Sequence, residues 1–249
     1  MHLVVQKTDV GFFSSFNILV ASLLDLKKNG IEDIVVYWNN MLYQNEPSNL
    51  FDEFFYEQNY SNENLIVHNA ISLGAKYYSP ILERGIFIEL NEILKKYKHF
   101  ESKGYLTCKN ISAHKPNSIG VHIRRTDHYK HSKLLDIEEF FLRIDKKIEE
   151  EKYENIFLMT DEQQVVNIFE EKYGNKVYTN EVIRSQDQYP IHYSGFVDRK
   201  NLALNVMTDA ISLSRCEEII VTSSNIAGYS LMLSPNIKYD QIDKNNKHY

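Results

Sequence analysis

The sequence predicts an α/β protein, because segments of strand length alternate along the chain with longer segments of helical periodicity. In the first half, the strand-like residues 3–6 and 33–38 enclose one helical segment, and such a βαβ unit places its strands in parallel. The second half repeats this alternation over residues 119–233. The polar segment 108–117 separates the two halves. We therefore expect two α/β domains, residues 1–112 and residues 113–249.

The helical segment of the first half has apolar residues at spacings of three and four, which is the periodicity of a helix packed on a sheet. These residues are Phe16, Leu19, Val20, Leu23, Leu24 and Leu26. The helix is expected to begin near Ser14 or Ser15, because serine is a common N-cap residue, and to end at Asn29-Gly30. Further helices are predicted at residues 50–56 and 91–100, and a strand at residues 65–67.

The second half is predicted to be doubly wound, with parallel strands separated by helices. Strands are expected at residues 119–124, 155–160, 176–179 and 218–222. Helices are expected at residues 137–152, 162–173, 198–216 and 223–233. Asp198 is expected to cap the third of these helices, and Pro235 to stop the last one.

Composition and charge exclude several classes of protein. With 249 residues, 43% of them hydrophobic, the chain is long enough to bury a substantial core. A net charge of −6 argues against general nucleic-acid binding, which requires an excess of basic residues. The sequence has neither the pattern of a signal peptide nor a run of about 18 apolar residues. A soluble protein with a cytoplasmic location is therefore expected.

Metal-binding and disulfide patterns are absent from the sequence. Cys108 and Cys216 are far apart and have no nearby histidine pattern, which indicates neither a zinc site nor a disulfide framework. The chain also has no HExxH motif and no DxD pair to hold a divalent ion against a diphosphate. A reducing compartment and metal-independent chemistry are therefore expected.

Three of the predicted strands end in polar residues, at the carboxyl ends that meet along one edge of a parallel sheet. They are Arg124, Arg125, Thr126 and Asp127; Thr160, Asp161 and Glu162; and Thr222, Ser223, Ser224 and Asn225. Arginine can fork two N–H donors onto phosphate oxygens, and the start of a helix offers backbone N–H groups to an anion. The pattern predicts a phosphate site centred on Arg124, with Asp127 orienting the guanidinium or acting as an acid or base.

These features also have purely structural interpretations. Arg124 and Arg125 can form a surface ion pair with Asp127, and Ser223 and Ser224 can simply cap the last helix. The prediction of a site therefore rests on the convergence of the strand ends rather than on any one of them.

Other residues have two interpretations each. Asp209 lies among apolar residues of a helix, where its carboxylate can bind the paired N–H donors of a guanine base or make a structural hydrogen bond. His122 is in the middle of a strand, where a histidine is more often packed in the core than catalytic. Trp38 and Tyr43 are expected in the core, with stacking on a sugar as the alternative.

Residues 122–127, HIRRTD, resemble the HxRRxD motif shared by α-1,6-, α-1,2- and protein O-fucosyltransferases. Three later segments resemble further motifs of those families in the same order: residues 157–161 (FLMTD), 209–214 (DAISLS) and 222–225 (TSSN). The resemblance is closest to the α-1,6 group and covers about residues 118–235.

The resemblance implies a GT-B-like arrangement, in which two Rossmann-like domains face a cleft and the second holds most of the donor. It implies an inverting, metal-independent transfer of fucose from GDP-fucose to a glycan hydroxyl, with no cofactor. Two alternatives stay open: a transferase that uses another nucleoside-diphosphate-sugar, and a non-catalytic module that binds a sugar nucleotide. The resemblance does not identify the acceptor, the linkage or the oligomeric state.

The resemblance also assigns residues to the nucleotide. Arg124 matches the arginine that contacts the β-phosphate, Asp209 matches the residue at the guanine, and His122 matches another position around the nucleotide. The remaining residues expected to bind the donor are Ser223 or Ser224, which match phosphate-contacting serines. Thr222 and Asn225 beside these serines, and Arg125 beside Arg124, are expected to bind the donor as well.

The catalytic base is not identified by the resemblance. In the α-1,6 group a glutamate a few residues beyond the motif is the candidate, whereas residues 128–132 of this chain read HYKHS. The residues here that can accept the acceptor proton are Asp127, His128 and His131, and Asp127 ranks first because it belongs to the matched motif.

Overall fold

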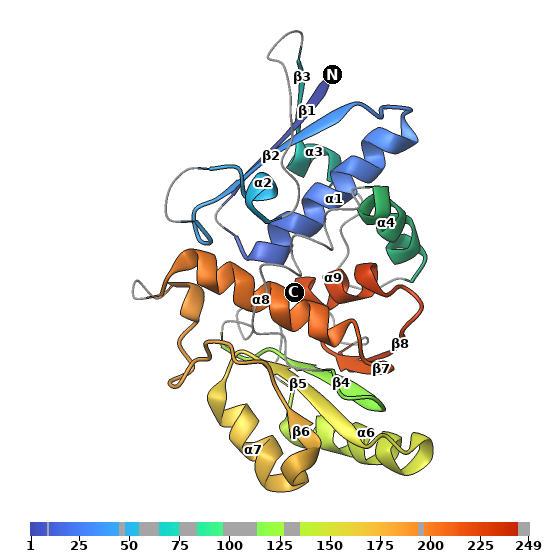
Figure 1. Ribbon diagram of the computed structural model, residues 1–249, viewed down its shortest axis with the longest axis vertical. Helices are drawn as coiled ribbons and strands as arrows, with labels where there is room; N and C mark the ends of the chain where they lie inside the picture. Colours follow the sequence, from blue (N-terminus) through green and yellow to red (C-terminus); the bar gives the residue numbers. More distant parts are fainter. Residues whose placement is uncertain are drawn as a thin grey trace. The chain divides into compact units, whose positions relative to one another are not determined.

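Two parallel sheets organise the residues that the computed structural model describes (Figure 1). The described residues are 1–8, 10–44, 48–54, 65–74, 84–96, 114–126, 135–193 and 197–243. They belong to two units, one comprising Met1–Lys109 and Asp198–Met207, the other Asn110–Val197 and Thr208–Tyr249. Each unit contains one of the sheets.

The first unit has, in its described part, a three-stranded parallel sheet with the strand order β2-β1-β3. Its strands are β1 (His2–Thr8), β2 (Ile34–Asn40) and β3 (Ile66–Asn69). Its helices are α1 (Phe12–Lys28), α2 (Leu50–Phe54), α3 (Ala70–Gly74) and α4 (Arg84–Lys96). The predicted βαβ unit is confirmed, because β1 and β2 pair in parallel and α1 connects them.

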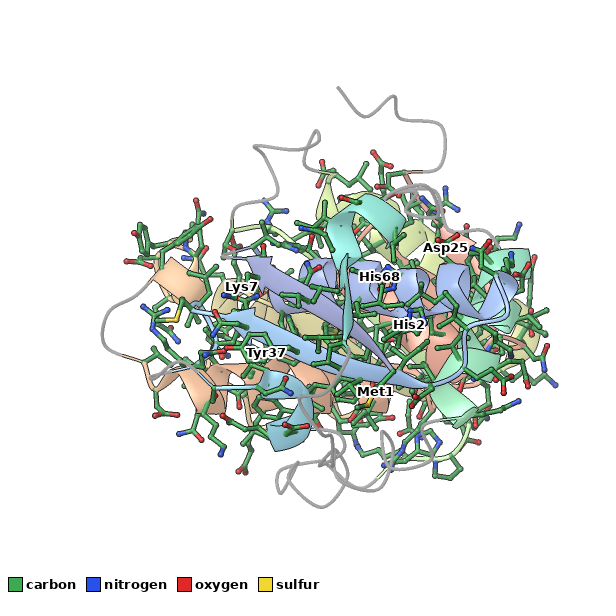
Figure 2. All side chains as sticks on the ribbon, turned by 90° about the horizontal axis from the view of Figure 1, so that it is seen from above. Met1, His2, Lys7, Asp25, Tyr37 and His68 are labelled. Atoms are coloured by element: carbon green, nitrogen blue, oxygen red, sulfur yellow. The ribbon has the colours of Figure 1, made fainter. Side chains whose placement is uncertain are left out.

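One face of this sheet packs against α1 and forms an aromatic core. The indole N–H of Trp38 donates to the hydroxyl of Ser15 on α1 over 3.1 Å. Trp38 is 0% and Tyr43 5% exposed, so both rings belong to the core and neither is accessible to a sugar. Side chains alternate along a strand, so Lys7 and Tyr37 lie on the opposite face, where the Lys7 ammonium is 5.8 Å from the ring centroid (Figure 2).

The second unit has a five-stranded parallel sheet with the strand order β6-β5-β4-β7-β8 in its described part. The strands are β4 (Ser118–Ile123), β5 (Asn155–Thr160), β6 (Val177–Tyr178), β7 (Glu218–Val221) and β8 (Lys238–Gln241). The helices are α6 (Ile137–Glu151), α7 (Gln163–Tyr173), α9 (Asn225–Leu233) and the carboxyl end of α8 (Arg199–Leu213), whose residues 199–207 belong to the first unit. 3₁₀ turns lie at Gly174–Lys176 and Ile191–Tyr193.

Helices cover both faces of the five-stranded sheet, as expected for a doubly wound fold. Helices α6 and α7 lie on one face, and α9 and the carboxyl end of α8 lie on the other (Figure 1). Gly120 in the central strand permits the close approach of α8. A Cβ atom at this position would lie 2.7 Å from Leu213 Cδ1 and 3.0 Å from Cys216 Sγ. The sheet and its two helical layers therefore bury β4 completely.

The structure confirms most of the predicted elements of the second half and corrects several boundaries. Strand β5 has the predicted bounds, and the Asn201 N–H donates to Asp198 Oδ1 over 2.8 Å, which confirms the cap of α8. Strand β8 was not predicted, because it follows the helix that was expected to be the last element. In the first unit, α1 begins at Phe12 and α4 at Arg84, both earlier than expected, and α3 was not predicted.

No helix among the described residues is long and apolar enough to cross a membrane.

Candidate functional site

The carboxyl edge of the five-stranded sheet has a polar residue just beyond the end of each strand. Arg124 follows β4, Asp161 follows β5, Asn180 lies beyond β6, Ser223 lies beyond β7, and Asp243 lies beyond β8. The chain order reverses between the neighbouring strands β4 and β7, with β5 and β6 to one side and β8 to the other. Open α/β sheets bind ligands outside such a switch point. Arg124 and Ser223 follow the two strands that form it.

Asp161 fixes the backbone of the loop that carries Arg124. Its Oδ1 accepts the Arg125 N–H over 2.9 Å, and its Oδ2 accepts the Thr126 N–H over 3.2 Å and the Thr126 hydroxyl over 2.6 Å. A carboxylate that accepts three hydrogen bonds from two adjacent residues holds the backbone of those residues in place. The half-buried Arg124 therefore extends from a backbone that is held at the next two residues.

The side chain of Arg125 has a structural partner. Its Nε lies 3.4 Å from Oε2 of Glu162, a carboxylate that is 5% exposed. Burial raises the pKa of Glu162, and the positive charge of Arg125 opposes that rise. The alternative of an ion pair with Asp127 falls outside the described residues, as do the predicted base candidates Asp127, His128 and His131.

The turn between β7 and α9 is held by residues at the end of β8. The Ser223 N–H donates to both carboxylate oxygens of Asp243, each over 2.9 Å, and Gln241 Nε2 donates to Ser223 Oγ over 2.6 Å. The neighbouring Thr222 is 4% exposed, and its hydroxyl has no hydrogen-bond partner among the residues that the structure describes. A buried hydroxyl without a partner is costly, so the turn retains a donor for a ligand or a water molecule.

Ser224 caps α9, which confirms the structural interpretation for this residue. Its hydroxyl accepts the Ala227 N–H over 3.1 Å, and Asn225 is the first residue of the helix. The same hydroxyl lies 3.4 Å from His122 Nδ1. His122 is 2% exposed, as expected for a packed strand residue, and contacts the start of α9 through Ser224. Strand β4 and helix α9 are thereby connected at the switch point.

Asp209 is a buried carboxylate on α8 and is 6% exposed. Its Oδ1 accepts a hydrogen bond from Asn180 Nδ2 over 2.9 Å, and no hydrogen bond within the described chain reaches Oδ2. Burial raises the pKa of Asp209 to about 6, while the Asn180 hydrogen bond and the nearby positive charge of Arg184 lower it. The pKa of Asp209 therefore lies closer to neutral pH than that of a free aspartate, and Oδ2 accepts no hydrogen bond from the described chain.

The guanidinium of Arg184 lies near Asp209 but forms hydrogen bonds with its own loop. It donates to the carbonyl oxygen of Asn180 over 3.0 Å and to that of Val182 over 3.5 Å. Its Nε is buried and has no partner in the described part of the chain. Burial lowers the pKa of Arg184. The loop after β6 thus contributes two side chains to the surroundings of Asp209.

Sequence reasoning missed two residues of this edge and the role of a third. Asp161 was recognised as a polar strand end but not as the acceptor for the Arg124 loop, and Asn180 and Asp243 were not considered. The available signal was their position, because each lies just beyond the end of a strand.

Among the described residues, no three histidine, cysteine, aspartate or glutamate side chains lie close enough together to hold a metal ion.

Comparison with known proteins gives a fold likeness. No family model matches the sequence, and no curated protein matches it. Among solved structures, NodZ α-1,6-fucosyltransferase soaked with GDP-fucose is similar, with a TM-score of 0.53, 17% identity and coverage of 94% of this chain and 92% of that chain. The structure of NodZ from Bradyrhizobium has a TM-score of 0.55, 16% identity and coverage of 99% and 98%. The chain shares the fold of these fucosyltransferases. The α/β fold class predicted from the sequence is thereby confirmed.

Proposed function

We propose that the protein is a glycosyltransferase that moves fucose from GDP-fucose to a hydroxyl group of a glycan. The observation that carries the proposal is the meeting of family-like segments at one sheet edge. Residues 122–126 and 157–161 are joined through Asp161, and residues 222–225 follow the strand that pairs with β4. The fold likeness to NodZ, a fucosyltransferase whose structure was soaked with GDP-fucose, supports the same activity.

In this proposal the donor diphosphate lies at the switch point between β4 and β7. Arg124 donates to the β-phosphate, and Thr222, Ser223 and the first N–H groups of α9 donate to the remaining oxygens. Asp209 binds the N1–H and the exocyclic amine of guanine through its carboxylate. His122, Ser224 and Asn225 form the adjoining wall, and Arg125 adds positive charge nearby. The reaction uses no cofactor besides the donor.

The proposed transfer of fucose develops negative charge on the β-phosphate, which is part of the leaving group. The acceptor hydroxyl oxygen bonds to the anomeric carbon of fucose while the bond from that carbon to the phosphate oxygen breaks, and the hydroxyl proton passes to a base. We propose Asp127 as this base, with His131 as the other candidate. Negative charge grows on the β-phosphate as the bond breaks, so Arg124 stabilises the transition state more than the bound donor. Inversion and independence of metal ions are part of the proposal.

Asp161→Asn is expected to reduce turnover by about tenfold or more while leaving the protein folded. The amide keeps an acceptor oxygen at only one of the two carboxylate positions, so its NH₂ group faces either the Arg125 N–H or the Thr126 N–H. The backbone after Arg124 is then held less firmly. The measurement is the steady-state rate of transfer together with a thermal unfolding curve. Asp145→Asn is the matched control, since Asp145 accepts hydrogen bonds from Lys172 and Tyr173 on the helical layer. Equal turnover of Asp161→Asn and wild type would remove Asp161 as a positioning residue.

A donor screen tests the proposed function itself. Purified protein is incubated with a mixed glycan acceptor library and with GDP-fucose, GDP-mannose or UDP-sugars, and release of the nucleoside diphosphate is measured. Release from GDP-fucose, and formation of a fucosylated product, is the expected result. Release from a different donor would support another sugar-nucleotide transferase. Binding of GDP by calorimetry without transfer to any acceptor would indicate a non-catalytic module and contradict the proposal.

A further inference from the structure

The amide of Asn180 contacts Asp209 and Ser212 in the interior of the second unit. Its Nδ2 donates to Asp209 Oδ1 over 2.9 Å and to Ser212 Oγ over 3.0 Å, and its Oδ1 lies 3.3 Å from the Ser212 hydroxyl. The side chain is 1% exposed. Rotating the amide by half a turn would place its carbonyl oxygen against the Asp209 carboxylate, so the hydrogen bonds define a single orientation.

The two partners of Asn180 lie on one turn of α8. Asp209 and Ser212 are three residues apart, so they face the same direction from the helix. Asn180 itself lies two residues beyond the carboxyl end of β6. The amide therefore connects the loop at the sheet edge to this turn of α8. Its hydrogen bond also fixes the rotation of the Asp209 carboxylate about the Cβ–Cγ bond.

The nature of this contact leaves Asp209 able to bind a ligand. Asn180 is a neutral donor and engages Oδ1, while no hydrogen bond in the described chain reaches Oδ2. Arg184, the nearby cation, donates to backbone carbonyl oxygens of its own loop. A buried carboxylate held by a neutral amide keeps its full charge for an incoming pair of N–H donors.

We infer that Asn180 is a positioning residue that orients the Asp209 carboxylate for hydrogen bonding to a nucleobase. It thereby sets the selectivity for guanine over other nucleobases. The inference rests on the proposed function, in which Asp209 binds the base. Guanine offers two adjacent N–H donors to a carboxylate, whereas hypoxanthine lacks the exocyclic amine and adenine lacks the N1–H. A carboxylate in a fixed orientation distinguishes these patterns, because the wrong base leaves a buried charge without its donors.

Calorimetric titration with GDP, IDP and ADP tests this role. Asn180→Ala is expected to lower the ratio of GDP to IDP affinity by about 5- to 10-fold, which corresponds to the loss of one well-formed hydrogen bond. Asn180→Ser is the second variant in case the alanine protein does not fold, because its hydroxyl is too short to span to Asp209. Ser214→Ala is the control, since Ser214 is a buried serine directly after α8 whose hydroxyl donates to the Ile211 carbonyl. Its affinity ratio is expected to equal that of wild type.

A readout without nucleotide separates this inference from the proposed function. Carbon-detected NMR of the side-chain carboxyl in the free protein is expected to show a higher pKa for Asp209 in Asn180→Ala than in wild type, because a donor to the charged form is lost. An unchanged pKa and an unchanged GDP to IDP ratio in a folded Asn180 variant would overturn the positioning role. Wild-type protein that binds none of the nucleotides would instead contradict the proposed function, and with it the selectivity for guanine.

Discussion

Purified Arg124→Ala protein is expected to transfer fucose about 10²- to 10³-fold more slowly than wild type, which is the usual effect of removing one donor from a preorganised charge-stabilising site. Arg124 follows the strand at the switch point and extends from a loop whose next two residues are held by Asp161. In the proposed site its guanidinium donates to the β-phosphate, and this interaction strengthens as the leaving group gains charge. The KM for GDP-fucose is expected to change less than kcat.

Two further arginine variants make this experiment specific. Arg124→Lys keeps the charge but loses the planar fork, so its rate is expected to lie between those of Arg124→Ala and wild type. Arg143→Ala removes an arginine whose guanidinium forms an ion pair with Asp240 at 2.6 Å, and its rate is expected to match wild type. Release of GDP in the presence of acceptor is the measurement. An Arg124→Ala rate equal to that of wild type would remove Arg124 from the site.

Much of the fold of the second unit was predictable because its strands are buried on both faces. Strand β4 is completely buried and β5 nearly so, and such strands are short apolar segments between helices with clear periodicity. Strand β8 was not predictable in the same way. It reads KYDQ, lies at the edge of the sheet and is mostly half-buried or exposed, so no apolar pattern marks it.

The residues of the candidate site were predictable only in part. The rule that ligands bind at the carboxyl edge brings Arg124 and Ser223 together from sequence alone. The pairs that hold this edge are not local: Arg125 and Asp161 are 36 residues apart, Asn180 and Asp209 29, and Ser223 and Asp243 20. Neither helical nor strand periodicity encodes such pairs, because they depend on the order of strands in the sheet. The sequence therefore indicated the edge but not the partners that hold it.

Asp209→Asn is expected to stabilise the free protein at pH 7, by up to about 3 kcal/mol in the free energy of unfolding. Burial raises the pKa of Asp209 from 3.8 to about 6, so the folded state holds a proton more tightly than the unfolded chain does. Ionising Asp209 above pH 6 therefore costs stability, and the cost disappears as the pH falls toward 4. Urea unfolding of wild type and variant is expected to show a difference at pH 7 that shrinks at pH 4.

The same substitution is expected to weaken GDP binding at pH 7 by roughly 10- to 150-fold, which corresponds to about 1.5–3 kcal/mol for hydrogen bonds to a charged group. The oxygen of the new amide retains the Asn180 hydrogen bond, so its NH₂ group takes the position of Oδ2 and meets the N–H donors of guanine. Wild-type affinity is expected to fall about tenfold for each pH unit below about 6, because guanine then competes with the proton on Asp209. The variant lacks this dependence.

A nearby carboxylate distinguishes a specific role of Asp209 from a general effect of charge. Asp187 is an exposed residue of the same loop as Asn180, and it accepts hydrogen bonds from the Tyr189 N–H over 3.1 Å and the Ser185 hydroxyl over 3.3 Å. Asp187→Asn is expected to leave GDP affinity and its pH dependence unchanged. If Asp209→Asn were more stable at pH 7 yet bound GDP as tightly as wild type, the carboxylate would not bind guanine. Its burial would then lower stability without contributing to nucleotide binding. A variant that is both less stable and weaker in GDP binding would instead indicate a structural role for Asp209. Higher stability with weaker GDP binding is expected only when a buried charge is retained for a ligand.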